Sequence, residues 1–387
     1  MKLLVTTTSS SSEEDTQACR LYLSLFFLVT ISVIIFTQAA AELLKVGVAF
    51  TLVDPKEYFH HCVGALRAAV NPGNFLDQHI SSQSSHHYSE YASKTAIPFR
   101  EAFGDSFVQG SVVSLDLENH KAMLEGGKKF FVVPLFFFLD LEPYHSHWHV
   151  PGREIAWTHC LVAVGSLGPV PGRSQQLTME GLEQEAKMMA ENIEKAEKVV
   201  IIGGGPVGFE LAGEIFDKYK QEKKVTIVSA SDKLVSNDFS DKFNASVKYL
   251  WESAWVEVVV GKADLTTVKL NMVEKQSLHL GEVELEADLV ISCIGMPPNK
   301  AEVAKLLPAT SIDENGRVKV DEYLAVEGCS DVFALGDCCN TAEHKMAAHA
   351  AVHGECLVGV CKRLLLNSIC TVSQIQKRRD CGCQHPT

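Results

Sequence analysis

The sequence predicts an α/β fold with two domains, each built around a mainly parallel sheet. Its 387 residues are too many for one ordinary core and fit two domains. Short apolar runs that are typical of buried parallel strands alternate with segments rich in helix formers. One such alternation, Val199–Val228, has the length and the glycine spacing of a complete strand–helix–strand unit.

Composition and charge exclude several classes of protein. Hydrophobic residues make up 46% of the chain, which indicates a globular protein rather than a disordered one. The formal net charge of −13 argues against nucleic acid as a partner, because a surface that follows phosphates needs clustered Lys and Arg. The 12 cysteines are too scattered for a disulfide scaffold and indicate a reducing compartment. We predict no metal site, because Cys338-Cys339, Cys381-x-Cys383 and the alternating histidines at 145–149 have no matching ligands nearby.

The strongest local signal is the glycine-rich turn Gly203-Gly-Gly205-Pro-Val-Gly208. Apolar strand-like residues precede it, helix formers follow it, and a second strand over Val225–Val228 closes the unit. Gly203 allows the tight turn, Gly205 lets the main chain approach a diphosphate, and Gly208 lets the helix pack closely on the strand. The anion would lie on the helix N-terminus, where free N–H groups and the helix dipole favour negative charge. The pattern predicts a Rossmann-like domain that binds a nicotinamide dinucleotide, rather than a purely structural turn.

The residue after this second strand bears on the choice between NADH and NADPH. Ser229 replaces the acid that would hold the ribose hydroxyls, and Lys233 lies close by. Without a carboxylate nothing repels a 2′-phosphate, and Lys233 could attract one unless it is merely solvated. Both nucleotides therefore stay open.

A second set of segments fits a second dinucleotide-binding domain, formed by residues 42–170 and 296–366. An apolar run ends at Asp54, a position from which an acid would contact a ribose. Two further strands end in glycine turns, one at Ala163–Ser166 and one at Gly336-Asp337.

The glycine-rich loop that should precede Asp54 is missing. The first glycine of the whole chain is Gly47, and Ile31–Phe36 fill the expected place. Bulky side chains there would block the close approach of a diphosphate.

The order of these motifs resembles the pyridine nucleotide-disulfide oxidoreductase-like family of FAD-dependent oxidoreductases. The matching motifs are Asp54, Ala163–Ser166, the glycines at 203–208, Cys293-Ile-Gly295 and Gly336-Asp337. The blocks Leu52–His61, Ala65–Ala68, Gly165–Gly172 and Lys345-Met-Ala-Ala348 are similar to a group of quinone reductases within it. The resemblance covers roughly residues 38–127 and 152–365. It implies two Rossmann-like domains, with an NAD(P) domain at 171–295 inserted in an FAD domain.

The resemblance also implies the chemistry. Its cofactors are FAD and NAD(P)H, and its activity is NAD(P)H:quinone oxidoreduction. Such enzymes reduce ubiquinone and vitamin K-type lipid quinones to radical-trapping hydroquinones, which suppresses lipid peroxidation (ferroptosis). The cofactor-binding residues that it implies are Asp54, Gly165, Gly203, Gly205, Gly208, Glu210, Ser229, Gly295, Asp337 and Met346. The resemblance implies that Glu210 and Lys345 are catalytic residues. It places His60 and His61 near the flavin, although packing in the core explains them equally well.

Several departures from the family favour an alternative. Besides the missing loop, residues 128–151 form an aromatic-dense insertion with no counterpart, and the pattern fades after Leu366 into an irregular tail at 367–387. We therefore expect a truncated C-terminal domain. A catalytically impaired, membrane-tethered NAD(P)-binding or scaffold variant is the alternative function. A disulfide reductase is disfavoured, because Cys62 stands without a second cysteine near it.

Residues 1–41 form an atypical N-terminus with an uncharged apolar segment, Leu21–Phe36. Its length is slightly short of the roughly 20 residues that span a bilayer. A membrane anchor, a buried core segment and a signal peptide all fit, although the stretch before it carries acids instead of a basic region. Lys2 follows Met1, so the family's acylated N-terminal glycine is absent. The resemblance implies cytosol-facing association with a lipid droplet, the plasma membrane or the mitochondrial outer membrane.

Overall fold

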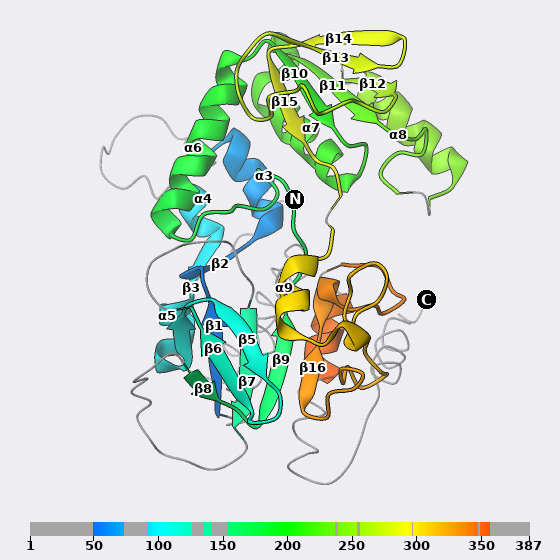
Figure 1. Cartoon of the computed structure of the whole chain (residues 1–387). Coiled ribbons are helices and arrows are strands. Elements are labelled where there is room, and N and C mark those ends of the chain that lie inside the picture. Colours follow the sequence, from blue (N-terminus) through cyan, green and yellow to red (C-terminus); the bar gives the residue numbers. More distant parts are fainter. Residues whose placement is uncertain are drawn as a thin grey trace, which may run out of the picture.

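The chain folds into two α/β units, one above the other in Figure 1. The computed structural model describes residues 49–72, 91–125, 135–140, 154–236, 239–253, 256–295, 297–346 and 349–356. The apolar segment Leu21–Phe36, the tail at 367–387 and the histidines at 145–149 lie outside these residues. None of the helices in the described ranges is both long enough and apolar enough to cross a membrane.

The first unit is built on a five-stranded sheet, drawn in the lower half of Figure 1. Its strands, in spatial order, are β16 (Val332–Ala334), β9 (His159–Ala163), β7 (Leu135–Asp140), β1 (Ala49–Asp54) and β4 (Phe107–Gln109). β1 is parallel to β4 and β9 is parallel to β16, whereas β7 is antiparallel to both of its neighbours. Four strands therefore run in one direction, and the middle strand runs in the other.

The second unit is built on a fully parallel sheet of four strands. In spatial order they are β12 (Val256–Val260), β11 (Lys224–Ser229), β10 (Lys198–Ile202) and β15 (Leu289–Ser292). Helix α7 (Pro206–Tyr219) connects β10 to β11, so the predicted strand–helix–strand unit is confirmed. Apolar side chains recur along α7 at helical spacing, which buries Leu211 and Ile215 against the sheet.

Helices and a hairpin cover the two faces of this second sheet. One face is covered by α6 (Met179–Lys195), α7 and α3 (Cys62–Val70), and the other by the hairpin of β13 (Gln276–Leu280) and β14 (Val283–Ala287). Helix α8 (Asp241–Ser253) contacts the edge strand β12. Although α3 precedes residue 171 in the sequence, its Leu66 and Val70 are buried in this second core. The two units are therefore joined through a shared core.

The core of the first unit lies between its main sheet and a smaller one. The smaller sheet comprises β5 (Val112–Asp116), β6 (Lys121–Leu124) and β8 (Glu154–Ala156), and helix α9 (Lys300–Leu306) packs beside it. β5 and β6 pair with each other in the antiparallel direction, whereas β4, just before them in the sequence, is parallel to β1. The remaining short elements are β2 (Tyr58–His60), β3 (Ala96–Pro98), α4 (Tyr91–Lys94), α5 (Phe99–Phe103) and the 3-10 turns at 104–106, 220–222, 309–311 and 336–338.

Part of the aromatic-dense segment at 128–151 belongs to the first sheet. Its residues Leu135–Asp140 form β7, the middle strand of the first sheet. A strand at this position satisfies main-chain hydrogen bonds on both sides, which an apolar segment in a loop could not do.

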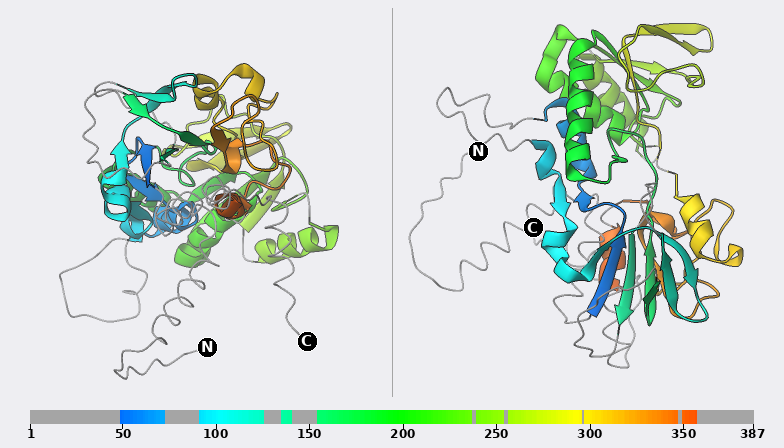
Figure 2. Two further views of the ribbon diagram at one scale, coloured as in Figure 1. Left: turned by 90° about the horizontal axis from the view of Figure 1, so that it is seen from below. Right: turned by 60° about the vertical axis from the view of Figure 1, so that its left-hand side comes forward.

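The two units are connected by two main-chain segments that pair with each other. One leaves the end of β9 and the other leaves the end of β15, and the Leu167 N–H donates to the Pro297 carbonyl at 2.8 Å. Ser166 and Pro298 form an antiparallel bridge beside it. Because β9 and β15 both end here, the carboxyl edges of both sheets face the connection. The right-hand view of Figure 2 shows the second unit above the first sheet, with these connections between them.

Candidate functional site

The glycine turn after β10 is held by contacts that side chains would disrupt. Gly203 has φ +130°, and a Cβ there would lie 2.5 Å from the Cys293 carbonyl oxygen. A Cβ on Gly208 would overlap the Gly203 carbonyl oxygen, which confirms the close packing of helix on strand. A Cβ on Gly204 would overlap Ser229. These three glycines are therefore required by the fold itself.

Gly205 is different, because it faces open space. It is the N-cap of α7, with φ −85°, and a Cβ there would meet nothing within 4 Å. Pro206, the first residue of α7, has no N–H, but the N–H groups of Val207 and Gly208 have no acceptor within the helix and can bind an anion beside Gly205. This is the place at which a diphosphate can lie against the main chain.

The loop after β11 folds over this turn. The buried Ser229 hydroxyl donates to the Ser231 carbonyl at 2.7 Å, and the Val235 N–H donates to the Gly204 carbonyl at 2.7 Å. The Lys233 ammonium lies 3.6 Å from an Asp241 carboxylate oxygen. Ser229 therefore brings no charge toward a ribose, and the charge of Lys233 is partly balanced by Asp241.

Asp54 ends β1 at the carboxyl edge of the first sheet. It is buried, and burial raises the pKa of its carboxyl to about 7, although the Lys56 N–H donates to Oδ1 at 2.7 Å and favours the charged form. The Lys56 ammonium donates to the Ser174 carbonyl at 2.6 Å, which ties this edge to the connecting segment.

Asp337 contacts the other predicted glycine turn, a contact that the sequence did not predict. The Ser166 hydroxyl donates to Asp337 Oδ2 at 2.7 Å, and the Arg173 guanidinium donates to the same oxygen at 3.3 Å. Gly165 and Gly336 both adopt positive φ, of +59° and +75°, so each strand can turn sharply at this edge. The motifs at 163–166 and 336–337 are thus brought together.

A buried histidine that sequence reasoning missed supports this turn. The Gly336 N–H donates to His353 Nδ1 at 3.2 Å, and the other ring nitrogen of His353 pairs with the Glu343 carboxylate. Burial lowers the pKa of His353, while Glu343 opposes this effect. No motif marks either residue or Arg173, because their partners lie far from them in the sequence.

The two predicted catalytic residues lie in different units. The Lys345 ammonium donates to the Thr341 carbonyl and hydroxyl, both at 2.7 Å, and burial lowers its pKa. Met346 beside it is 51% exposed. Glu210 lies in α7, where desolvation and then the neighbouring Glu214 raise its pKa. Gly295, at φ +20°, follows β15 and meets open space.

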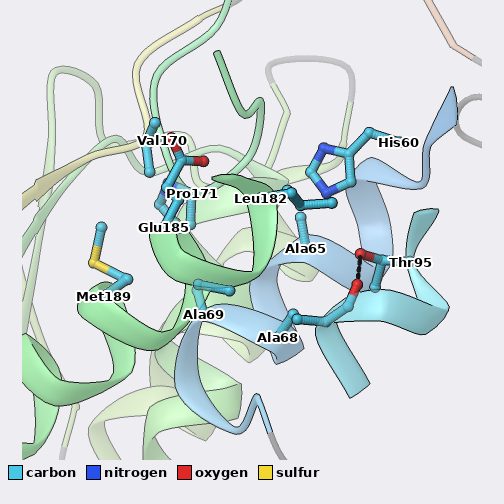
Figure 3. A pocket seen from close by; sticks show the side chains of 12 residues that line it. His60, Ala65, Ala68, Ala69, Thr95, Val170, Pro171, Leu182, Glu185 and Met189 are labelled. Carbon is cyan, nitrogen blue, oxygen red and sulfur yellow. Dashed lines mark hydrogen bonds between the residues drawn. The ribbon is translucent and has the colours of Figure 1, made fainter. Parts of the chain in front are cut away.

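A narrow cavity lies between α3, α4, α6 and the connecting segment (Figure 3). Alanine side chains of α3 line much of it, and the Thr95 hydroxyl beside them donates to the Ala92 carbonyl at 2.7 Å. His60 reaches it from β2, and burial together with nearby Lys56 lowers the pKa of His60 to about 3. His60 is therefore neutral near pH 7, which favours core packing over acid catalysis. No group of three His, Cys, Asp or Glu residues in the described ranges could hold a metal ion.

The described residues fit the two expected cofactors unequally. The turn at Gly205 and the N-terminus of α7 fit the diphosphate of NAD(P)H, and Asp54 and Asp337 stand where acids would hold the hydroxyls of FAD. A glycine loop for the FAD diphosphate is missing from the sequence before Asp54.

Comparisons with known proteins place the chain. A model of the pyridine nucleotide-disulphide oxidoreductase family matches residues 37–354. Ferroptosis suppressor protein 1 of Mus musculus is 30% identical over 325 residues, which is 83% of this chain and 75% of that protein. The Homo sapiens protein of the same name is 30% identical over 330 residues, with the same coverage. Apoptosis-inducing factor homolog A of Dictyostelium discoideum is 26% identical over 344 residues, 84% of this chain and 73% of that protein.

Solved structures share the fold. A NAD-dependent persulfide reductase from A. fulgidus has a TM-score of 0.59 at 17% identity and covers 84% of this chain, which spans only 57% of that one. The water-forming NADH oxidase from Lactobacillus brevis, bound to NADH, has a TM-score of 0.56 at 16% identity, with 84% of this chain and 67% of that chain covered. These structures confirm the predicted α/β fold, and the family match confirms the cofactor pair FAD and NAD(P)H. The chain belongs to the pyridine nucleotide-disulphide oxidoreductase family, as an NAD(P)H-dependent flavoprotein oxidoreductase.

Proposed function

We propose that this chain is an NAD(P)H:quinone reductase that acts on lipid quinones of the ubiquinone and vitamin K type. FAD, when bound, would supply the two-electron relay between nicotinamide and quinone. The similarity to proteins named Ferroptosis suppressor protein 1 supports a product that limits lipid peroxidation. A membrane surface is then the place of action, on a lipid droplet, the plasma membrane or the mitochondrial outer membrane.

One observation carries the proposal: the carboxyl edges of both sheets face the same connection. In open α/β sheets, ligands bind at the carboxyl ends of the strands. Gly205 stands at one edge, and Asp54 and Asp337 stand at the other. Two dinucleotides bound at these edges would bring their reactive rings together in the space between the units.

The chain's own residues then hold and orient the reactants. The main chain at Gly205 and the N-terminus of α7 would bind the NAD(P)H diphosphate. Asp337, oriented by Ser166 and Arg173, would accept hydrogen bonds from a ribityl chain. Lys345 would hold a proton at Nζ, and its lowered pKa would make that proton easier to release.

The cysteines support a quinone over a disulfide as the substrate. Cys62 begins α3, and the next cysteine in the sequence is Cys160. A disulfide reductase needs two thiols near the flavin that can exchange with each other. Cys338 and Cys339 are adjacent, but both are fully buried behind Asp337.

Replacing Gly205 tests the function without disturbing the fold. A Cβ on Gly205 meets nothing within 4 Å, so Gly205→Val should fold while its side chain fills the place of the diphosphate. We expect NADPH affinity to fall at least about 100-fold, since main-chain hydrogen bonds to a charged group contribute about 1.5–3 kcal/mol each. The measurements are NADPH titration and reduction of a short-chain ubiquinone at saturating FAD. Gly110→Val is the matched control, because a Cβ there lies 3.9 Å from Leu124.

A non-catalytic NAD(P)-binding scaffold is the second candidate, and the missing FAD loop favours it. Such a protein would bind NADPH with the same sensitivity to Gly205→Val. It would reduce no quinone even at saturating FAD, and that result would reject the reductase proposal.

A further inference from the structure

Four neighbouring strands of each main sheet occupy corresponding positions, although the chain visits them in a different order. In the second unit the order β12-β11-β10-β15 places β10 between the strand that ends at Ser229 and the strand that leads into the connection. In the first unit the order β4-β1-β7-β9 places β7 between the strand that ends at Asp54 and the strand that leads into the connection. By position, therefore, β7 is the counterpart of β10.

The direction of these two strands differs. β10 is parallel to both neighbours, so it ends at the carboxyl edge and continues into the glycine turn and α7. β7 is antiparallel to both neighbours, with Phe136 opposite Val53 on one side and opposite Val162 on the other. β7 therefore begins at the carboxyl edge, and its last residue, Asp140, lies at the opposite edge beside Ala49.

We propose that this reversed strand permanently occupies the place of the diphosphate-binding strand in the first unit, so that FAD binds as a dissociable coenzyme. A strand that begins at the carboxyl edge cannot deliver a helix N-terminus there, because the chain leaves it at the other edge. The FAD diphosphate consequently loses the row of free N–H groups that Gly205 and α7 offer to NAD(P)H. This inference rests on the proposed function, because it describes the flavin side of the same site.

Charged side chains near Asp54 and Asp337 do not replace these N–H groups in binding the FAD diphosphate. Asp54 and Asp337 are acids, and a carboxylate beside a diphosphate is repelled by it. Of the cations beside these acids, Arg173 donates to Asp337, and Lys56 donates to the Ser174 carbonyl in the connecting segment. FAD is then held through its hydroxyls and its ring, and not through its most highly charged part.

Cross-linking tests the position of β7. Leu139 is opposite His159 in the register of β7 and β9, at the end of the strands away from the cofactor edge. Directly opposite residues of antiparallel strands lie within disulfide distance. The double variant Leu139→Cys/His159→Cys should form a disulfide between these positions, located by peptide mass mapping. Asp140→Cys/His159→Cys, one residue out of register, should not. If no disulfide forms between positions 139 and 159, or if both double variants form it equally, the placement of β7 between β1 and β9 is overturned.

Flavin dependence tests the consequence and separates it from the proposed function. After gel filtration in flavin-free buffer, the full chain should lack stoichiometric flavin absorbance and show at least about a tenfold gain in NADPH–ubiquinone activity when FAD is added. The disulfide-locked 139–159 variant should show the same gain, since β7 stays in place. Stoichiometric flavin and full activity without added FAD would reject the inference and leave the reductase proposal intact. No activity at saturating FAD, with NADPH still bound, would reject the reductase proposal instead.

Discussion

Four strands of the two sheets occupy corresponding positions, but one central strand differs in direction, and on our proposal this difference separates a complete diphosphate site from an incomplete one. After β10, the chain turns through Gly203–Gly208 into α7 at the carboxyl edge. Beside Asp54, the central strand β7 begins at that edge instead. We infer that the position of a strand in the sheet fixes where a dinucleotide lies, whereas its direction decides whether the main chain can bind the diphosphate.

The largest effect that we expect concerns the close contact between α7 and β10 in the second unit. Gly208→Val would drive its Cβ into the Gly203 carbonyl oxygen and should lower the free energy of unfolding by at least about 3 kcal/mol. Gly205→Val should cost less than about 1 kcal/mol, since only the N-cap preference changes. Urea unfolding of both variants measures the difference. Equal losses of unfolding free energy in the two variants would contradict a structural role for Gly208 and a binding role for Gly205.

The next effect concerns the pH dependence of the unfolding free energy. β1 ends in the acid Asp54, whereas β11 ends in the uncharged Ser229. Burial raises the folded-state pKa of Asp54 from 3.8 to about 7. The protonated carboxyl therefore makes its full contribution to the stability of the fold below pH 3.8, and this contribution is lost as the pH rises through about 7. By linkage this loss amounts to about 2–3 kcal/mol between about pH 5 and about pH 8. Asp54→Asn should remove that part of the pH dependence of the unfolding free energy. An unchanged pH profile in the variant would show that Asp54 is not the titrating group.

A smaller effect concerns nucleotide choice at the second sheet. Asp241→Asn leaves Lys233 without its partner at 3.6 Å and should strengthen NADPH binding about threefold at low salt, in the range of an exposed ion pair. NADH lacks the 2′-phosphate, so its affinity should stay the same. Lys233→Ala is the matched variant and should weaken NADPH alone. Equal changes in the affinities for NADH and NADPH would exclude an interaction of Lys233 with the 2′-phosphate.

The smallest effect concerns the helix that joins the units. The Arg67 guanidinium of α3 bonds both carboxylate oxygens of Glu214 in α7, with Nε at 3.0 Å from each. Because both side chains are partly exposed, a double-mutant cycle with Arg67→Met and Glu214→Gln should give a coupling of about 0.5 kcal/mol. Zero coupling would show that this ion pair adds nothing to the packing of α3 against α7.

Local signals in the sequence predicted the second unit well. The strand, the glycine turn and the helix over 199–228 follow one another, so periodicity and spacing contain most of their information. The strand ends at Ser166 and Asp337 were also recognised, but the hydrogen bond between these two residues was not predicted. The role of β7 was not predicted either, since pairing between distant strands leaves no local pattern. His353 and Glu343 were missed for the same reason: only the fold brings them to Gly336.

Calorimetric titration of FAD and NADPH into the same flavin-free protein compares the two edges most directly. We predict that NADPH binds with heat that Gly205→Val abolishes, and that FAD binds with a dissociation constant of about 1 μM or weaker in both proteins. FAD that cannot be removed without denaturing the chain, or binds far below that concentration, would contradict the reversed strand as the cause of an incomplete site.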